Sequence, residues 1–226
     1  VSHNSEGLRK TLEKRYPAIR GIPWWHSVVF TSAAFSSGSL PEEINKWEFM
    51  DADAFIKSET SFFNFIEKVI DEVKSKYDIE RIIVAGMSNG GMMAQTIGCT
   101  LGHKVDAVIN IAGMQAKGMS CIPEESVSIV MYGAKNDTTV PPVDVVASDG
   151  YLYEPMGNTI KAWKDKLNCA NSTIREFSTP SAITVEHFFD CKNNNTVTAI
   201  LDHDNNHDWP NPYKWGIDLL FEPLLK

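Results

Sequence analysis

Residues 81–100 read RIIVAGMSNGGMMAQTIGCT, and this stretch decides the fold. A short apolar run leads directly into G-M-S-N-G at residues 86–90, and a helical pattern follows it. A serine on a tight strand-to-helix turn needs neighbours without bulk, and the flanking glycines supply them. Gly91 lets the helix pack close to the strand. The helix N-terminus then points towards Ser88, and the Asn89 N–H becomes available to a developing oxyanion.

The surrounding chain alternates between two kinds of pattern. Short apolar runs that are typical of buried strands occur at residues 27–31, 81–85, 107–111, 128–132 and 197–201. Apolar residues at helical spacing predict helices over 61–77 and 159–167, with Thr60 or Ser61 and Asn158 as their respective N-caps. This alternation predicts the α/β class, with a mostly parallel central sheet flanked by helices.

Length and composition limit the classes of function. The chain has 226 residues, of which 43% are hydrophobic and 22% charged, and this fits one domain over residues 1–226. The formal net charge is −8 without a basic stripe, which argues against a nucleic-acid partner. No apolar run approaches the roughly 20 residues that a membrane-spanning helix needs.

A serine on such a turn needs a histidine base, which follows an acid in the chain order of this arrangement. His207 lies in the polar loop 202–210, just after the apolar run 197–201, and structure-breaking residues follow it. It is the preferred base. His203 is nearer to the end of the predicted strand and is the second choice.

The acid is expected after the preceding core strand, 128–132. Asp137 lies in the loop 133–141 that follows this strand, and it is the preferred acid. Asp144, further along the same connection, is the fallback.

Four cysteines are present, Cys99, Cys121, Cys169 and Cys191, and no two of them form a C-x-x-C pair. This argues against zinc and thioredoxin-like chemistry. The count alone is compatible with two disulfide bonds in an exported protein or with four reduced thiols, and three pairings are open.

Three segments resemble the polyhydroxybutyrate depolymerase and feruloyl esterase-like family of the α/β-hydrolases. Residues 86–93, GMSNGGMM, look like the serine motif of that family. The loop 133–141 is similar to its G-T-x-D-x-x-V-P acid loop, with one additional residue between Gly133 and Asp137. The sequence HDWP at 207–210 looks like its H-x-W-P loop. The resemblance covers about 67–210 and implies Ser88 as nucleophile, Asp137 as acid and His207 as base.

The resemblance also bears on the cysteines and on the start of the chain. It implies the disulfide bonds Cys99–Cys121 and Cys169–Cys191, and with them a secreted or extracytoplasmic protein. The family carries an early H-G motif after two strands, and here those strands seem reduced or missing from the sequence pattern. The matching residues are His3 and Asn4, so Asn4 replaces the glycine. Ser5 would then donate the second oxyanion N–H.

The implied reaction is hydrolysis of carboxylic esters through an acyl-enzyme, with no metal or organic cofactor. Short acyl, hydroxycinnamoyl and polyester substrates are all compatible with it. Trp24 and Trp25 precede a predicted strand and would form either an aromatic wall of the site or part of the core. Residues that flank the expected site or follow strand ends are candidates for substrate contact: Met87, Met114, Gln115 and Trp209.

Two alternative functions remain at this point. His203 and His207, with the aspartates of the loop 202–208, resemble a divalent metal site. The asparagine pair in this loop and Pro210 favour a loop over a helix, so the two histidines would not share a helix face. The other alternative is a non-catalytic binding module on a hydrolase fold.

Overall fold

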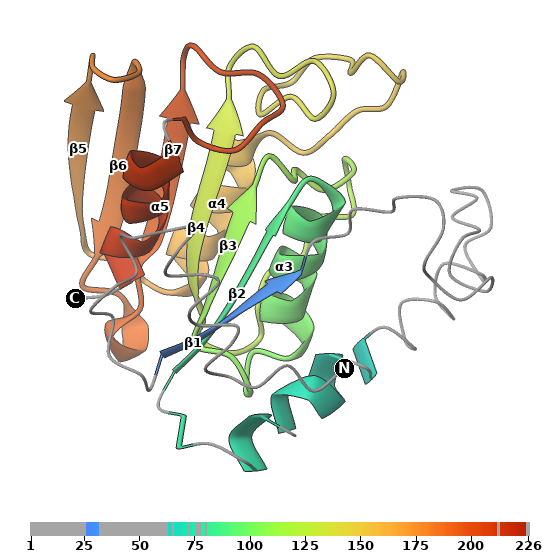
Figure 1. The fold of residues 1–226 in the computed structure, drawn as a ribbon, viewed down its shortest axis with the longest axis vertical. Helices are drawn as coiled ribbons and strands as arrows, with labels where there is room; N and C mark the ends of the chain where they lie inside the picture. Colours follow the sequence, from blue (N-terminus) through green and yellow to red (C-terminus); the bar gives the residue numbers. More distant parts are fainter. Residues whose placement is uncertain are drawn as a thin grey trace.

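The computed structural model describes residues 26–31, 63–64, 66–71, 73–75, 78–79, 81–211 and 213–224 (Figure 1). Several residues singled out above lie outside these ranges: His3, Asn4, Ser5, Trp24, Trp25, Thr60 and Ser61. The predictions made for them therefore stay predictions.

A seven-stranded sheet in the order β1-β2-β3-β4-β7-β6-β5 forms the centre of the described part. Its strands are β1 (His26–Thr31), β2 (Arg81–Met87), β3 (Ala107–Ile111), β4 (Ser128–Ala134), β5 (Asn171–Phe177), β6 (Ile183–Phe189) and β7 (Val197–Asp202). Strands β1, β2, β3, β4 and β7 are parallel to their neighbours, whereas β6 runs antiparallel to β7 and to β5. The predicted α/β class with a mostly parallel sheet is confirmed.

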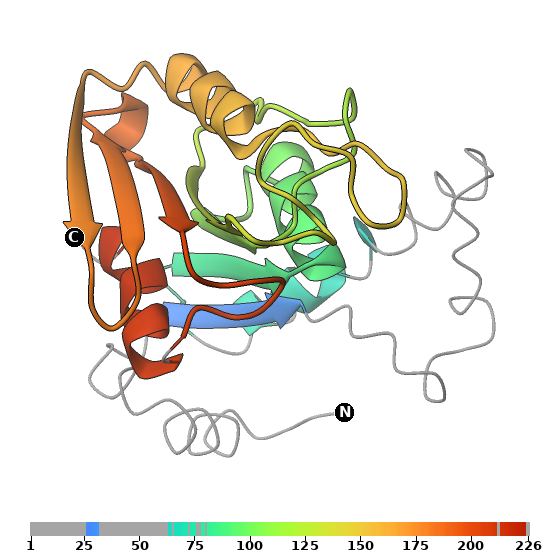
Figure 2. The same ribbon diagram turned by 90° about the horizontal axis from the view of Figure 1, so that it is seen from above.

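Helices cover both faces of this sheet (Figure 2). Helices α3 (Asn89–Thr100) and α4 (Met156–Lys166) pack on one face, where buried Ile97 and Trp163 join a hydrophobic cluster with alternate strand residues such as Val108. Helix α5 (Tyr213–Phe221) packs on the other face, in a second cluster. Short 3-10 turns follow at η2 (Lys192–Asn194) and η3 (Glu222–Leu224). No helix among the described residues is long and apolar enough to span a membrane.

Two local features differ from the sequence prediction. Helix α4 starts at Met156, three residues before the predicted start, and its N-cap is Pro155 rather than Asn158. Pro155 has φ −54°, a value that its ring favours and that suits the entry into a helix. Strand β5 matches no apolar run, because it is an edge strand with mostly exposed side chains.

The parallel strands place three chemically important loops together. Ser88 follows β2, Asp137 lies three residues after the end of β4, and His207 lies in the loop after β7. The carboxyl ends of these strands lie along the upper edge of the sheet in Figure 1. Residues separated by more than a hundred positions in the sequence therefore meet at one edge.

Candidate active site

Ser88 occupies a strained turn between β2 and α3. Its φ of 56° and ψ of −125° are unusual for a residue with a side chain. The turn is fixed on both sides, because the Ser88 N–H donates to the Ile111 carbonyl at 2.8 Å, and the Ser88 carbonyl accepts from the N–H groups of Gly91 and Met92. Strain of this kind persists only where the surroundings impose it, and it is common in active sites.

Two glycines let the elements around Ser88 approach one another. A Cβ on Gly113, just after β3, would lie 2.5 Å from the Ser88 carbonyl oxygen and 2.7 Å from the Met92 nitrogen. A Cβ on Gly91 would lie 3.0 Å from the Ile111 carbonyl oxygen and would collide with Asn110 Oδ1. Helix α3 therefore packs against β3 at a distance that only glycine permits at these two positions.

His207 connects Ser88 with Asp137. The Nε2 atom of His207 lies 2.9 Å from Ser88 Oγ, and its Nδ1 atom lies 2.7 Å from Asp137 Oδ2. With a proton on Nδ1, the ring donates to the carboxylate and leaves Nε2 free to accept from the serine hydroxyl. The structure thus brings together the three residues that the sequence ranked first.

Asp137 is buried, and its carboxylate is well satisfied. Its side chain has 0% exposure. Besides the His207 contact at Oδ2, its Oδ1 accepts from the N–H groups of Thr139 and Val140, each at 2.8 Å. Burial alone raises the pKa of this carboxyl, but the hydrogen bonds from His207, Val140 and Thr139 outweigh it and hold the pKa below its ordinary value of 3.8. Asp137 is therefore ionised at neutral pH.

The fallback residues lie elsewhere and have other partners. His203 Nε2 lies 2.9 Å from the Thr184 hydroxyl on β6. Asp144 forms a surface ion pair with Lys117 at 2.7 Å. Neither residue has a hydrogen bond to Ser88 or His207 in this structure.

The acidic loop 202–208 does not gather its side chains around one point. His203 turns to Thr184, whereas His207 lies between Ser88 and Asp137. Across the part of the chain that the structure describes, no three or more His, Cys, Asp or Glu residues are grouped as metal ligands. The donor geometry in this loop thus does not support the metal-binding interpretation.

The residues expected near the substrate occupy different environments. Met87 and Trp209 are half-buried and pack against the hydrophobic cluster on the α5 face. Met114 is 1% exposed and belongs to the core cluster on the α3 face. Gln115 is 8% exposed, and its side chain hydrogen-bonds within the protein. We therefore carry only Met87 and Trp209 into the proposed substrate site.

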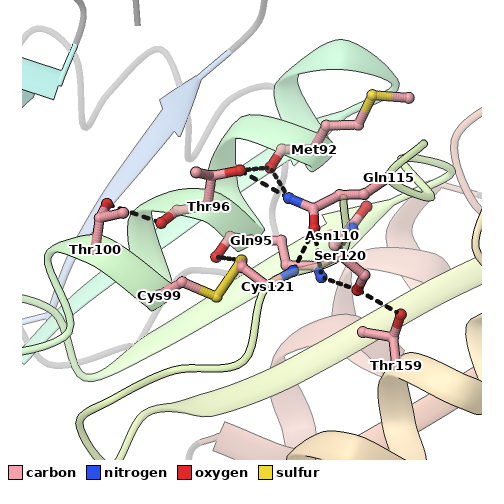
Figure 3. The surroundings of a disulfide bond; sticks show 10 residues. All are labelled: Met92, Gln95, Thr96, Cys99, Thr100, Asn110, Gln115, Ser120, Cys121 and Thr159. Carbon is pink, nitrogen blue, oxygen red and sulfur yellow. Dashed lines mark hydrogen bonds between the residues drawn. A yellow bond between two sulfur atoms is a disulfide. The ribbon is translucent and has the colours of Figure 1, made fainter. Parts of the chain in front are cut away.

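A buried polar network beneath the serine turn was missed in the sequence (Figure 3). Asn110 on β3 donates through Nδ2 to Gln95 Oε1 at 3.0 Å and to the Gly113 carbonyl at 2.9 Å. Gln115 donates to the Thr96 hydroxyl at 2.7 Å. Both Asn110 and Gln95 are fully buried. The sequence signal for this network was an asparagine inside the apolar run 107–111, since a buried polar side chain requires partners.

The described structure contains both disulfide bonds that the family resemblance implied. Cys99 near the end of α3 is bonded to Cys121, and Cys169 after α4 is bonded to Cys191 after β6. The Cys121 N–H also donates to Gln115 Oε1 at 2.9 Å, so the first disulfide is continuous with the buried network in Figure 3. It links the end of α3 to the segment that leads into β4.

The fold is similar to that of known esterases. It matches an acetyl xylan esterase from Aspergillus awamori with a TM-score of 0.52 and 16% sequence identity, over 71% of this chain and 66% of that chain. A thermostable esterase matches with a TM-score of 0.34 and 19% identity, over 47% of this chain and 26% of that chain. No protein-family model and no curated protein sequence matches the chain. The first similarity assigns an esterase-like α/β fold.

Proposed function

We propose that this protein is a serine hydrolase of carboxylic esters, with Ser88 as nucleophile, His207 as general base and Asp137 as the acid that orients it. The observation that carries the proposal is the continuous hydrogen-bonded chain from Ser88 Oγ through both ring nitrogens of His207 to Asp137. The strained backbone of Ser88 and the esterase-like fold support the same function.

In the first half of the reaction, Ser88 Oγ attacks the ester carbonyl while His207 Nε2 takes the hydroxyl proton. Asp137 fixes the ring tautomer and stabilises the imidazolium that forms. The resulting tetrahedral oxyanion accepts hydrogen bonds from backbone N–H groups. Asn89 is the first residue of α3, so its N–H has no acceptor within the helix and is suited to this role. Ser5, outside the described residues, is the proposed second donor.

In the second half, His207 gives its proton to the leaving alcohol, which departs and leaves an acyl group on Ser88. His207 then takes a proton from water, which attacks the acyl carbonyl. Collapse of this second intermediate releases the acid and returns the proton to Ser88. This chemistry uses no metal or organic cofactor.

The substrate class follows from the sequence resemblance. We place the chain in the polyhydroxybutyrate depolymerase and feruloyl esterase-like family, as one catalytic domain over residues 1–226 with short acyl, hydroxycinnamoyl or polyester substrates. Met87 and Trp209 flank Ser88 and His207 in the sequence and are the proposed substrate contacts, joined by Trp24 and Trp25 outside the described residues. The two disulfide bonds support an extracytoplasmic location, because such bonds persist in oxidising compartments.

Hydrolysis of nitrophenyl acetate by the purified protein and its Ser88→Ala variant tests the proposal. We expect the wild type to be active and the variant to lose at least roughly 10³-fold in kcat without unfolding, because the serine is partly exposed and packs little. Activity that survives in the variant would contradict the assignment. Loss of wild-type activity in a chelator would instead favour the metal-binding alternative.

A further inference from the structure

The loop that holds His207 has an unusual anchor. After Asp202, the last residue of β7, the chain continues to Pro210 without a helix or strand. Asp202 itself has 0% exposure, although its side chain is a carboxylate. Burial of a carboxylate costs free energy unless hydrogen bonds satisfy it. Its partners therefore show what this residue does.

Four donors converge on the Asp202 carboxylate. Oδ1 accepts from the backbone N–H groups of Asp204 and Asn205, each at 3.0 Å, and from the Ser181 hydroxyl at 3.1 Å. Oδ2 accepts from the Tyr132 hydroxyl at 2.9 Å. Two of these donors belong to the backbone of the loop, so the carboxylate fixes the first turn after β7.

Asn205 extends this anchor across the loop. Its Nδ2 donates to the Tyr132 hydroxyl oxygen at 2.8 Å and to the Trp209 carbonyl at 3.0 Å, and its Oδ1 accepts from the Asn206 N–H. The amide of Asn205 thus closes the segment 206–208, which contains His207. Tyr132 on β4 is fully buried, and burial raises the pKa of its phenol, so it stays protonated and donates to Asp202.

We propose that Asp202, with Tyr132 and Asn205, is a positioning residue that holds His207 between Ser88 and Asp137. This inference rests on the proposed hydrolase function. None of the three side chains has a hydrogen bond to the ring of His207, and they act through the backbone of its loop. The hydroxyl of Tyr132 links the loop to β4, the strand that precedes Asp137. One side-chain cluster therefore sets the base relative to its acid.

The proposal assigns Asp202 a role different from that of a metal ligand. Both of its oxygens are already occupied by donors from three separate segments, including Ser181. Loss of these bonds would let the backbone of 203–208 shift relative to Ser88. A displacement of about 1 Å in a catalytic group typically costs up to roughly 100-fold in rate.

The test uses Tyr132→Phe, which removes only the hydroxyl and keeps the buried ring. Tyr153→Phe is the matched control, because Tyr153 also donates to an aspartate, Asp149, at 3.0 Å, but on an exposed loop that does not carry His207. We expect Tyr132→Phe to lower kcat on nitrophenyl acetate by roughly 10- to 100-fold with KM changed less than about 3-fold. We expect Tyr153→Phe to keep wild-type kcat.

A spectroscopic readout separates positioning from general destabilisation. The proton on His207 Nδ1, bonded to Asp137, should give a downfield NMR signal that exchanges slowly in the wild type and in Tyr153→Phe. This signal should weaken or shift in Tyr132→Phe and in Asp202→Asn, recorded at a temperature where both remain folded by circular dichroism. If Asp202→Asn does not fold, Tyr132→Phe alone still decides the matter.

The outcomes distinguish this inference from the proposed function. If the wild type hydrolyses the ester but Tyr132→Phe keeps both its kcat and its His207 signal, the positioning role is wrong. If Tyr132→Phe and Tyr153→Phe lose kcat equally, the effect is not specific to the histidine loop and the proposal is also overturned. If the wild type itself neither hydrolyses esters nor reacts at Ser88, the hydrolase function fails, and the positioning role fails with it.

Discussion

The serine turn and the histidine loop are held in different ways. Ser88 is fixed by backbone hydrogen bonds between β2, α3 and β3, and by glycines that let these regular elements touch. His207 is carried by an irregular loop whose shape depends on polar side chains, above all Asp202 and Asn205. The comparison teaches that the serine position is encoded locally in the backbone, whereas the histidine position depends on contacts between distant parts of the chain.

The largest expected effect separates the two histidines of the irregular loop. His207→Ala should lower kcat roughly 10⁴-fold or more, because it removes the base that contacts Ser88. His203→Ala should keep most of the activity, since its ring faces Thr184. Steady-state kinetics on one ester substrate provide the measurement. A reversed order of the two variants would move the base to His203.

The acid comes next in size. Asp137→Asn should lower kcat roughly 10³- to 10⁴-fold, because an amide in place of the carboxylate favours the wrong tautomer of His207. Asp144→Asn is the matched control, as Asp144 pairs with Lys117 at the surface and should have little effect. A mild effect for Asp137→Asn together with a severe one for Asp144→Asn would refute the assignment of the acid.

The same difference explains what the sequence predicted. The motif 86–90 specifies its own geometry, so the strand, the turn and helix α3 followed from adjacent residues. The alternating pattern predicted the parallel strands and thus the edge where Asp137 and His207 meet. The order of serine, acid and histidine then ranked His207 above His203, and the structure brings the preferred residue to Ser88.

The residues that support the site could not be predicted in this way. Asp202 was interpreted as part of an acidic loop, because nothing nearby in the sequence indicates its contact with Tyr132, 70 positions earlier. The edge strand β5 has no apolar face towards the core and therefore gave no signal. Met114 follows a strand end, as a substrate contact would, but the side chain packs into the core.

A smaller effect tests the backbone side of the comparison. Gly113→Ala should lower stability by about 1–3 kcal/mol and reduce activity, because its Cβ would lie 2.5 Å from the Ser88 carbonyl oxygen. Gly157→Ala is the control, since a Cβ at this helical position meets nothing within 4 Å. Chemical denaturation measures both variants. Equal stabilities would show that the close approach around Ser88 is not required.

The smallest expected effect on activity concerns the disulfide bonds. Each joins cysteines separated by 22 positions, and loop closure of this size contributes roughly 3 kcal/mol to stability. A reducing agent should therefore lower Tm, while kcat at a temperature where the fold persists changes little. A Tm that is unaffected by complete reduction, checked by thiol titration, would contradict this role.

Covalent labelling of Ser88 tests the central claim most directly. The account predicts that a fluorophosphonate forms a single adduct, located on Ser88 by peptide mass spectrometry, because His207 activates this hydroxyl. Labelling should vanish in Ser88→Ala and slow strongly in His207→Ala. An adduct on a different residue, or a folded wild-type protein that does not react at neutral pH, would contradict the account.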